Sequence, residues 1–535
     1  MSSGGPDGPE SKAWKAWAEV LKVSRSLIRS FQRWQVAPSP ALYGLSLFLL
    51  SLAVLWQSAL SVRLSNGDAA LFATMAREMA AAPLRTWIHM GGFWEGWFYD
   101  KPPLLLWVEA ATMRLIGARA EAAVVPTLIA AHLTVWLVYK MGKRLVDQEF
   151  GFLAALVLCL TPSFVVQSRS PITEPMLVFF MALSLYWGMK LGRSPLFPLG
   201  AGVALACAFL TKGPPALAVL PVLAVYYMTA SPPAHCGENS RPAGGWQEVL
   251  SRIPWGRLSL VLVVALGILA LVDLWHFSQV SFSFWKRLFD KQVLPAILGK
   301  RENTRTEYTY YLWVLGRWYW PWLPALVAGL FVPWLLRRGH LQRDRIVRAW
   351  IFALTQAGII LLGFSLVPKK TRFYTHPYYI GLTLLVALTL YVLLLKRQNI
   401  YRHLISGAVV LSVGIFILAS VVPSVFHYPR FKLDAVIRIG REIKKTGVRI
   451  DTVQLIYRKC RGLAPWNLRF PYAFYLGAKN LVCGGEPKGI QLVDMRQDPS
   501  FRRDGSRILA IAYPFVLVDR RPGQKTPGGF KANQL

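Results

Sequence analysis

The chain has 535 residues, of which 54% are hydrophobic and only 16% are charged, and its mean hydropathy is +0.37. This composition excludes a soluble globular protein, which has fewer apolar and more charged residues. The net charge of +34 would suit a nucleic-acid-binding protein. However, most Lys and Arg residues lie in short loops beside apolar runs, which is the topology signal of membrane proteins. We therefore predict a mainly α, polytopic helical membrane protein that binds no nucleic acid.

The N-terminal segment, residues 1–40, is amphipathic, basic and rich in Trp. This pattern predicts a cytoplasmic helix at the membrane interface rather than a cleavable signal peptide. Because the segment is basic, the first span, Ala41–Val62, should begin in the cytoplasm.

Further apolar runs alternate with basic loops, and we predict about 11–13 spans within a transmembrane domain at residues 41–423. Several runs approach the roughly 20 residues that cross a bilayer of about 30 Å. The predicted spans after the first are Ala122–Tyr139, Phe152–Val166, Met176–Met189, Leu196–Leu210, Ala216–Met228, Leu258–Trp275, Tyr311–Leu336, Trp350–Leu366, Tyr378–Leu395 and Leu404–Val422.

The loop Ser65–Pro103 is far longer than a connection between two membrane helices requires. It is rich in charged residues and follows the first span. We interpret it as the floor of an active site at a membrane surface. The next segment, Leu104–Ile116, is short and carries Glu109 and Arg114, so we expect an interfacial helix in this first external loop.

The C-terminal region, residues 424–535, changes character. Leu433–Lys445 has the pattern of an amphipathic helix, whereas Asp451–Tyr457 and Ile508–Val518 have that of β-strands. We predict a small periplasmic α/β domain that ends in a disordered stretch, Arg520–Leu535. Cys460 and Cys483 both lie in this domain, and the sequence leaves open whether they form a disulfide.

The unusual polar groups follow alternate spans, so they should all lie on the external face. They are Asp68, Asp100, Lys101, Glu174, Lys212, the segment Lys286–Arg305 and the segment Lys369–Tyr374. Charges placed against the positive-inside bias and beside hydrocarbon are costly and usually functional. Structural alternatives stay open, because Asp68 could cap a helix Ala69–Ala82 and Lys101 could extend to the interface.

Two turns of similar composition suggest a site for an anion. Lys101 precedes Pro102 and Pro103, and Lys212 precedes Gly213 and Pro214. Proline fixes the backbone and removes a donor, so each turn should hold its ammonium group in place. Such an anion could be a phosphate, which Lys binds as a point charge and Arg binds with two parallel N–H hydrogen bonds.

These motifs come in a distinctive order along the chain. They are Asp68 in the first external loop, YDKPP (Tyr99–Pro103), ITEP (Ile172–Pro175), LTKGP (Leu210–Pro214) and KKTRFY (Lys369–Tyr374). In this order they resemble the membrane glycosyltransferases of the GT-C type, in particular the lipid A aminoarabinose transferase family, which is similar to the protein O-mannosyltransferases. The resemblance covers roughly Ala41–Pro377.

The resemblance implies an inverting glycosyltransferase that takes a sugar from a polyprenyl phosphate. It implies that Asp68 belongs to the catalytic centre, and we add Glu174, which stands where relatives have Asp. The residues expected to bind the lipid phosphate or the donor are Tyr99, Lys101, Lys212, Lys369, Lys370, Arg372 and Tyr374. No cofactor is required, although the family also associates a divalent metal with positions that Asp100 and His276 could fill.

The chain also departs from the family. Relatives often have Glu after the first Asp, then Arg and Tyr shortly beyond, whereas this chain has Ala69, Leu71 and Phe72. These departures concern the sugar and the acceptor more than the reaction type.

The predicted enzyme moves a sugar, aminoarabinose or another modified sugar, to lipid A, lipopolysaccharide or another periplasmic acceptor. It would be a multi-pass protein of the bacterial cytoplasmic membrane, with its active site and C-terminal domain in the periplasm. A protein O-mannosyltransferase-like enzyme and a secondary transporter are the alternatives. The sequence shows no internal repeat and no broken helices in matching halves, which argues against a transporter.

Overall fold

The structure is a computed structural model of the whole chain. The description covers residues 39–56, 64, 67–94, 96–97, 99, 101–229, 246–300, 307–336, 343–395, 407, 411, 431–446, 452–456, 462–463, 471–472, 474–476, 480–483, 490–494, 507–512 and 515–519. Several predictions fall outside these residues: most of the N-terminal segment 1–40, Asp100, most of the last span Leu404–Val422, Cys460 and the terminal stretch Arg520–Leu535.

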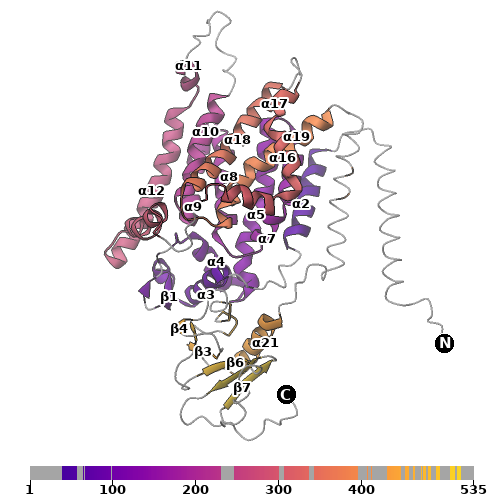
Figure 1. Cartoon of the computed structure of the whole chain (residues 1–535). Helices are drawn as coiled ribbons and strands as arrows, with labels where there is room; N and C mark the ends of the chain where they lie inside the picture. Colours follow the sequence, from indigo (N-terminus) through magenta and orange to yellow (C-terminus); the bar gives the residue numbers. More distant parts are fainter. Residues whose placement is uncertain are drawn as a thin grey trace, which may run out of the picture.

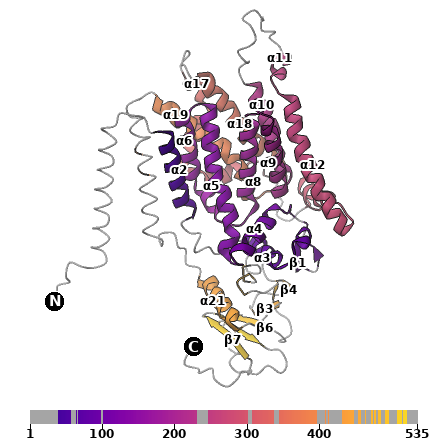
Figure 2. The ribbon, with the colours of Figure 1, turned by 180° about the vertical axis from the view of Figure 1, so that it is seen from behind.

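A bundle of apolar helices forms the larger part of the molecule (Figures 1 and 2). Its first half contains α2 (Pro40–Trp56), α5 (Ala120–Leu145), α6 (Gln148–Cys159), α7 (Pro162–Ser168), α8 (Thr173–Gly188), α9 (Leu196–Lys212), η3 (Pro214–Ala218) and α10 (Val219–Met228). The helices α5, α6, α8 and α9 pack side by side. The predicted span Phe152–Val166 corresponds to α6 and α7, which are bent by 64°. Pro162 begins α7, and proline disfavours continuation of a helix through this position.

The second half begins with α11 (Trp246–Ser251) and the long α12 (Trp255–Val280), followed by α13 (Phe284–Leu288), the π-helical turn η4 (Phe289–Val293) and α14 (Leu294–Ile297). Then come α15 (Tyr310–Trp318), η5 (Trp320–Trp322), α16 (Leu323–Leu330), α17 (Val332–Leu335), α18 (Arg343–Leu366), η6 (Arg372–Tyr378) and α19 (Tyr379–Leu395). The prediction of one continuous span Tyr311–Leu336 is wrong. Pro321, Pro324 and Pro333 stand at the starts of its separate pieces, where each removes a backbone donor.

By length and composition, four of the described helices are apolar enough to cross a membrane, or five if α6 and α7 form one bent span. The helix α12 packs against α9 and leaves apolar side chains such as Val263, Leu266 and Leu271 exposed. An exposed apolar face of this kind suits contact with lipid. The described helices bear out a mainly helical membrane-type fold, while the count of 11–13 spans stays a prediction.

Close contacts between backbones fix neighbouring helices. A Cβ atom on Gly151 of α6 would lie 2.4 Å from the carbonyl oxygen of Tyr139 on α5, and one on Gly381 of α19 would lie 2.4 Å from that of Ala353 on α18. Small residues allow such an approach, which is typical of helix packing within membranes.

The first loop lies beneath one end of the bundle (Figure 1). It contains α3 (Gly67–Ala81), η2 (Leu84–His89), the short strands β1 (Gly91–Trp94) and β2 (Gly96–Trp97), and α4 (Leu104–Ile116). The bounds of α4 are those predicted, and α4 packs against α3 and α5.

The C-terminal region is an α/β unit, as its patterns predict. It contains α21 (Phe431–Thr446) and a sheet of β3 (Thr452–Ile456), β4 (Gly462–Leu463), β5 (Asn480–Cys483), β6 (Ile490–Asp494), β7 (Arg507–Ala512) and β8 (Phe515–Asp519). The strand order is β4-β5-β3-β6-β8-β7, with β3 parallel to β5 and β6. Ile508–Val518 is not one strand but the antiparallel pair β7 and β8.

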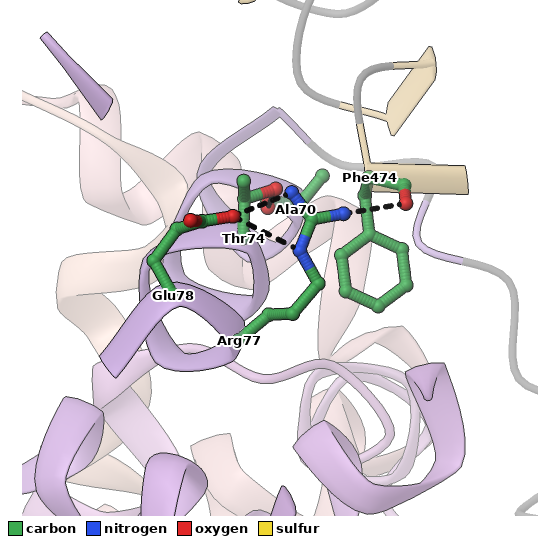
Figure 3. A network of polar contacts seen from close by, with 5 residues as sticks. All are labelled: Ala70, Thr74, Arg77, Glu78 and Phe474. Atoms are coloured by element: carbon green, nitrogen blue, oxygen red, sulfur yellow. Dashed lines mark hydrogen bonds and ion pairs between the residues drawn. The ribbon is translucent and has the colours of Figure 1, made fainter. Parts of the chain in front are cut away.

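This α/β unit contacts α3 of the first loop. The Arg77 guanidinium donates to the carbonyl oxygen of Phe474 at 2.9 Å and lies 5.6 Å from the centre of its ring, as Figure 3 shows together with the Arg77–Glu78 ion pair. The Tyr475 hydroxyl accepts from the backbone N–H of Leu64 at 2.8 Å. Contacts to residues 474 and 475 therefore flank the segment that carries Asp68.

Candidate active site

A pocket of about 480 Å³ lies where Lys101 of the first loop meets the end of the bundle. Its walls are mainly apolar and come from η3, α18 and the segment around α14, including Pro221, Leu288, Ile297, Ile359 and Phe364. Lys101, Lys212 and Tyr374 also line it. Three predicted donor-binding residues, from three distant parts of the sequence, thus meet in one place. We call this the apolar pocket.

Local backbone geometry places Lys212 at the pocket. Lys212 is the last residue of α9, and Gly213 follows it with φ of +82°. This left-handed conformation is easily adopted only by glycine, and it ends the helix. Pro214 and Pro215 then begin η3 and help to line the pocket.

A buried ion pair holds the Lys212 ammonium group. Its Nζ atom donates to Oε1 of Glu174, and both side chains are only 8% exposed. The same Nζ lies 4.5 Å from the centre of the Tyr374 ring. A buried charge is costly unless it is paired, so Glu174 and the ring of Tyr374 provide the environment in which Lys212 can stay charged.

Glu174 does not precede its helix, as a capping residue would. The helix α8 begins at Thr173 with Ile172 as its N-cap, so Glu174 lies in the first turn. The Thr173 hydroxyl donates to its Oε2 atom at 3.3 Å. Glu174 and Lys212 belong to separate motifs and lie 38 positions apart in the sequence. No spacing rule in the sequence predicts that they pair.

Asp68 is exposed in the first turn of α3, which begins at Gly67. The helix thus begins two residues before the predicted start at Ala69, which is within the ordinary uncertainty of helix boundaries, and the capping alternative stays open. Asp68 is not among the described residues that line the apolar pocket.

Two lysines of the KKTRFY motif also lie outside that lining. Lys369 is half-buried, and Lys370 is only 4% exposed. The Lys370 ammonium donates to the carbonyl oxygens of Ser365, at 2.7 Å, and Val367, at 3.0 Å. These oxygens lie at the C-terminal end of α18, where a cation is favourable. Burial lowers the pKa of Lys370.

Tyr99 and His276 meet in a buried aromatic cluster. Their ring centres are 4.9 Å apart, and the Arg287 guanidinium lies 5.1 Å from the centre of the Tyr99 ring. Burial raises the pKa of Tyr99. Neither residue is among the described lining of the apolar pocket, so Tyr99 does not join Lys101 there as the resemblance implied.

His276 offers one nitrogen that a metal could use. Its Nδ1 atom donates to the Phe282 carbonyl oxygen at 3.0 Å, while its buried Nε2 atom has no hydrogen-bond partner among the described residues. A metal needs further ligands, and no group of three or more His, Cys, Asp and Glu residues in the described parts of the chain could hold one. The described residues thus do not form a metal centre.

A second, smaller pocket of about 170 Å³ lies beside η6 and shares no lining residue with the apolar pocket. Arg372, Ser163, Gln167, Ser170 and Tyr379 provide its polar groups, and Trp318 and Phe373 provide aromatic rings. We call this the polar pocket. Of its residues, only Arg372 was predicted as a site residue. Gln167 lies near the end of α7, in a stretch without a recognisable motif, so the sequence did not identify it.

Comparisons with known proteins agree with the geometry. The model of the dolichyl-phosphate-mannose-protein mannosyltransferase family matches residues 100–245. An undecaprenyl phosphate-α-4-amino-4-deoxy-L-arabinose arabinosyl transferase of Edwardsiella ictaluri is 25% identical over 66% of this chain and 60% of its own. A lipid A galacturonosyltransferase, RgtD of Rhizobium johnstonii, is 34% identical over 22% of this chain and 25% of its own. The chain thus spans less than two thirds of the length of these curated relatives.

Solved structures show the same fold. The crystal structure of ArnT from Cupriavidus metallidurans bound to undecaprenyl phosphate has a TM-score of 0.63 and 16% identity, covering 91% of this chain and 99% of its own. The archaeal oligosaccharyltransferase AglB of Archaeoglobus fulgidus, in complex with an inhibitory peptide and a dolichol phosphate, has a TM-score of 0.51 and 12% identity, covering 85% of this chain and 69% of its own.

The chain thus shares the fold of the GT-C membrane glycosyltransferases, and residues 100–245 are similar to one family of that class. Within that class, the relatives to which the chain is similar include aminoarabinose transferases and the protein mannosyltransferase family. The resemblance stated from the order of the sequence motifs is thereby confirmed.

Proposed function

We propose that this protein transfers a sugar from a polyprenyl-phosphate donor to an acceptor at the external face of the bacterial cytoplasmic membrane. The observation that carries the proposal is the convergence of Lys101, Lys212 and Tyr374 on one largely apolar pocket. Two ammonium groups beside an apolar wall suit an amphiphile with an anionic head, and a prenyl phosphate has this chemistry. The ArnT structure contains undecaprenyl phosphate and the AglB structure contains a dolichol phosphate, and these lipids of similar proteins support the same assignment.

In the proposed reaction the bond between the anomeric carbon and the lipid phosphate oxygen breaks. A hydroxyl or phosphate oxygen of the acceptor forms the new bond with inversion, and the lipid phosphate leaves. Negative charge develops on the departing phosphate, so cations held at that position lower the barrier. Lys101 and Lys212 would stabilise this charge, with Glu174 positioning Lys212. Asp68 would orient the acceptor or take its proton.

The acceptor that we propose is lipid A, lipopolysaccharide or another periplasmic glycan or lipid, and the sugar is aminoarabinose or another modified sugar. The similarity to a lipid A galacturonosyltransferase supports lipid A as the acceptor, and the similarity to aminoarabinose transferases supports the sugar. A protein acceptor is the second candidate, because the family model that matches residues 100–245 is that of protein mannosyltransferases.

The test is transfer from a radiolabelled polyprenyl-phosphate sugar by the purified full chain. Lys212→Met should lower the rate at least 100-fold, about 2.7 kcal/mol of transition-state stabilisation. Asp68→Asn should lower the rate at least 10-fold without weakening donor binding, because the predicted role of Asp68 concerns the acceptor. Full activity of both variants would overturn the proposal.

A matched control is Lys190→Met. Lys190 lies just beyond the other end of α8 from Glu174, and its ammonium is 3.6 Å from the centre of the Tyr186 ring. This lysine also sits on an aromatic ring but is not among the lining residues of the apolar pocket. Its variant should keep full transfer.

A further inference from the structure

The polar pocket differs in chemistry from the apolar pocket. Its lining contains two serines, a glutamine, a tyrosine and an arginine, and it contains no carboxylate. Hydroxyl and amide groups that face a small cavity can exchange hydrogen bonds with a hydroxylated ligand, and a binding site typically uses a few such convergent polar groups.

The residues that line the polar pocket differ in their exposure to solvent. Ser163 is wholly buried and Gln167 is 8% exposed, whereas Arg372 is exposed. The buried residues therefore lie at the inner end and the guanidinium at the outer end. The Gln167 Oε1 atom is buried without a hydrogen-bond partner among the described residues. Leaving such an acceptor unsatisfied costs about 1–3 kcal/mol, so a ligand that donates to Oε1 would be favoured.

The Arg372 guanidinium is held by aromatic rings. Its Cζ atom lies 5.1 Å from the centre of the Trp318 ring and 4.9 Å from that of Phe373. Within the described residues no carboxylate pairs with it. A planar guanidinium that is oriented by stacking can donate two parallel N–H hydrogen bonds to one anion.

From these observations we propose that the polar pocket binds a monosaccharide ring that carries an anionic group, a phosphate or a carboxylate. Gln167 and the serine hydroxyls would bind the ring hydroxyls at the inner end. Arg372 would bind the anionic group at the outer end, beside Trp318. The volume of about 170 Å³ suits a single ring and excludes a prenyl chain or a longer glycan.

The role of the bound monosaccharide in the reaction rests on the proposed function. If the apolar pocket holds the donor lipid, the polar pocket on the other side of η6 is the place for the acceptor sugar. Tyr374 lines the first pocket, and Arg372 and Phe373 line the second. A single turn of chain would then contact both substrates.

The binding test uses calorimetry on the full chain in nanodiscs, with four probes: glucose 1-phosphate, glucuronate, glucose and inorganic phosphate. The wild-type protein should bind the two anionic sugars at least tenfold more tightly than glucose or phosphate alone. Gln167→Leu, which keeps the side-chain volume, and Arg372→Gln should each weaken this binding at least tenfold. Lys212→Met should change it less than twofold, because Lys212 lines the other pocket.

Several results would overturn the proposal. These are no binding of either anionic sugar by the wild-type protein, equal binding of phosphate alone, or loss of binding in Lys212→Met with full binding in Gln167→Leu. The last pattern would place the anion in the apolar pocket. Thermal unfolding of each variant identifies a misfolded protein, and Ser163→Ala, a smaller change at the inner end, then replaces Gln167→Leu and should weaken binding at least threefold.

The two proposals fail separately. If the wild-type protein transferred no sugar from the polyprenyl-phosphate donor, the proposed function would be wrong, but the binding of anionic sugars to the polar pocket would still stand. Conversely, normal transfer with no effect of Gln167→Leu on the apparent KM for the acceptor would remove only the acceptor role of the polar pocket.

Discussion

At the scale of single residues, the pair formed by Glu174 and Lys212 combines a structural and a chemical role that substitution can separate. Glu174→Gln leaves a buried ammonium without its carboxylate, and breaking a buried pair costs roughly 3–5 kcal/mol. We expect a clear fall in the thermal unfolding temperature of this variant. The double variant Glu174→Gln, Lys212→Met removes both charges, so it should recover most of the stability and stay inactive.

Comparing Glu174→Gln with the double variant shows whether Lys212 supports only the fold or also takes part in the reaction. Unfolding is measured by intrinsic fluorescence, and activity by the transfer assay. If the double variant recovered activity along with stability, Lys212 would only support the fold, and its proposed contact with the donor phosphate would be wrong.

Glu109 is a second buried carboxyl, and no charged group of the described residues forms an ion pair with it. It is wholly buried in α4, both oxygens lack a hydrogen-bond partner among the described residues, and burial raises its pKa well above the usual range. The folded protein therefore binds a proton that the unfolded chain releases above a pH of about 4.3. By linkage, the contribution of Glu109 to stability is full below that pH and declines as the pH rises toward the folded pKa.

Glu109→Gln should remove this pH dependence. The variant should gain stability relative to the wild-type protein as the pH is raised from 4.5 to 8, and the difference should vanish at the acidic end. Unfolding temperatures of both proteins across this range provide the measurement. A constant difference at all pH values would show that the Glu109 carboxyl has the same pKa in the folded and the unfolded protein.

At the scale of elements, the contact between α3 and the α/β unit makes a direct prediction. Arg77 and Leu64 bind residues 474 and 475 on either side of the Asp68 segment. Arg77→Ala, and separately Tyr475→Phe, should increase hydrogen exchange in the first turns of α3, because each removes one of these attachments. Arg85→Ala is a suitable control, since Arg85 is an exposed arginine of the same loop. Unchanged exchange in both test variants would show that α3 is held by the bundle alone.

Sequence patterns predicted most elements, because apolar periodicity and composition act locally. The interfacial helix Leu104–Ile116 was predicted with its correct bounds, and α21 was predicted within about two residues at each end. The breaks at Pro162, Pro321 and Pro333 were missed. A run such as Tyr311–Leu336 is uniformly apolar, and hydropathy alone does not distinguish one straight helix from several short pieces.

The same limit applies to the candidate site. The motifs identified Lys101, Lys212 and Tyr374, which the structure brings to one pocket. The motifs did not reveal that Lys370 binds the end of α18 or that Arg372 faces a different pocket from Tyr374. Adjacent residues of one loop point in different directions, and only the packing of η6 against its neighbours sets those directions.

At the scale of the whole molecule, the orientation in the membrane is a prediction that labelling can test. Ser170 precedes α8 and Ser194 precedes α9, so the two serines should lie on opposite faces. In a background without other cysteines, Ser170→Cys should react with an impermeant maleimide added from the periplasmic side. Ser194→Cys should react only after the membrane is permeabilised. Labelling of both from the same side would contradict the predicted alternation of spans.

The internal neutralisation of Lys212 bears on how the protein could discriminate among the many anions around it. An ammonium that is already matched by its own carboxylate has little long-range attraction for small mobile ions such as inorganic phosphate or chloride. A compound displaces or shares that carboxylate only if it brings additional free energy from elsewhere, and burial of a long hydrocarbon tail supplies about 0.8 kcal/mol for each methylene group. Selectivity for amphiphiles would then arise from the charge balance between Lys212 and Glu174 as well as from the shape of the apolar pocket.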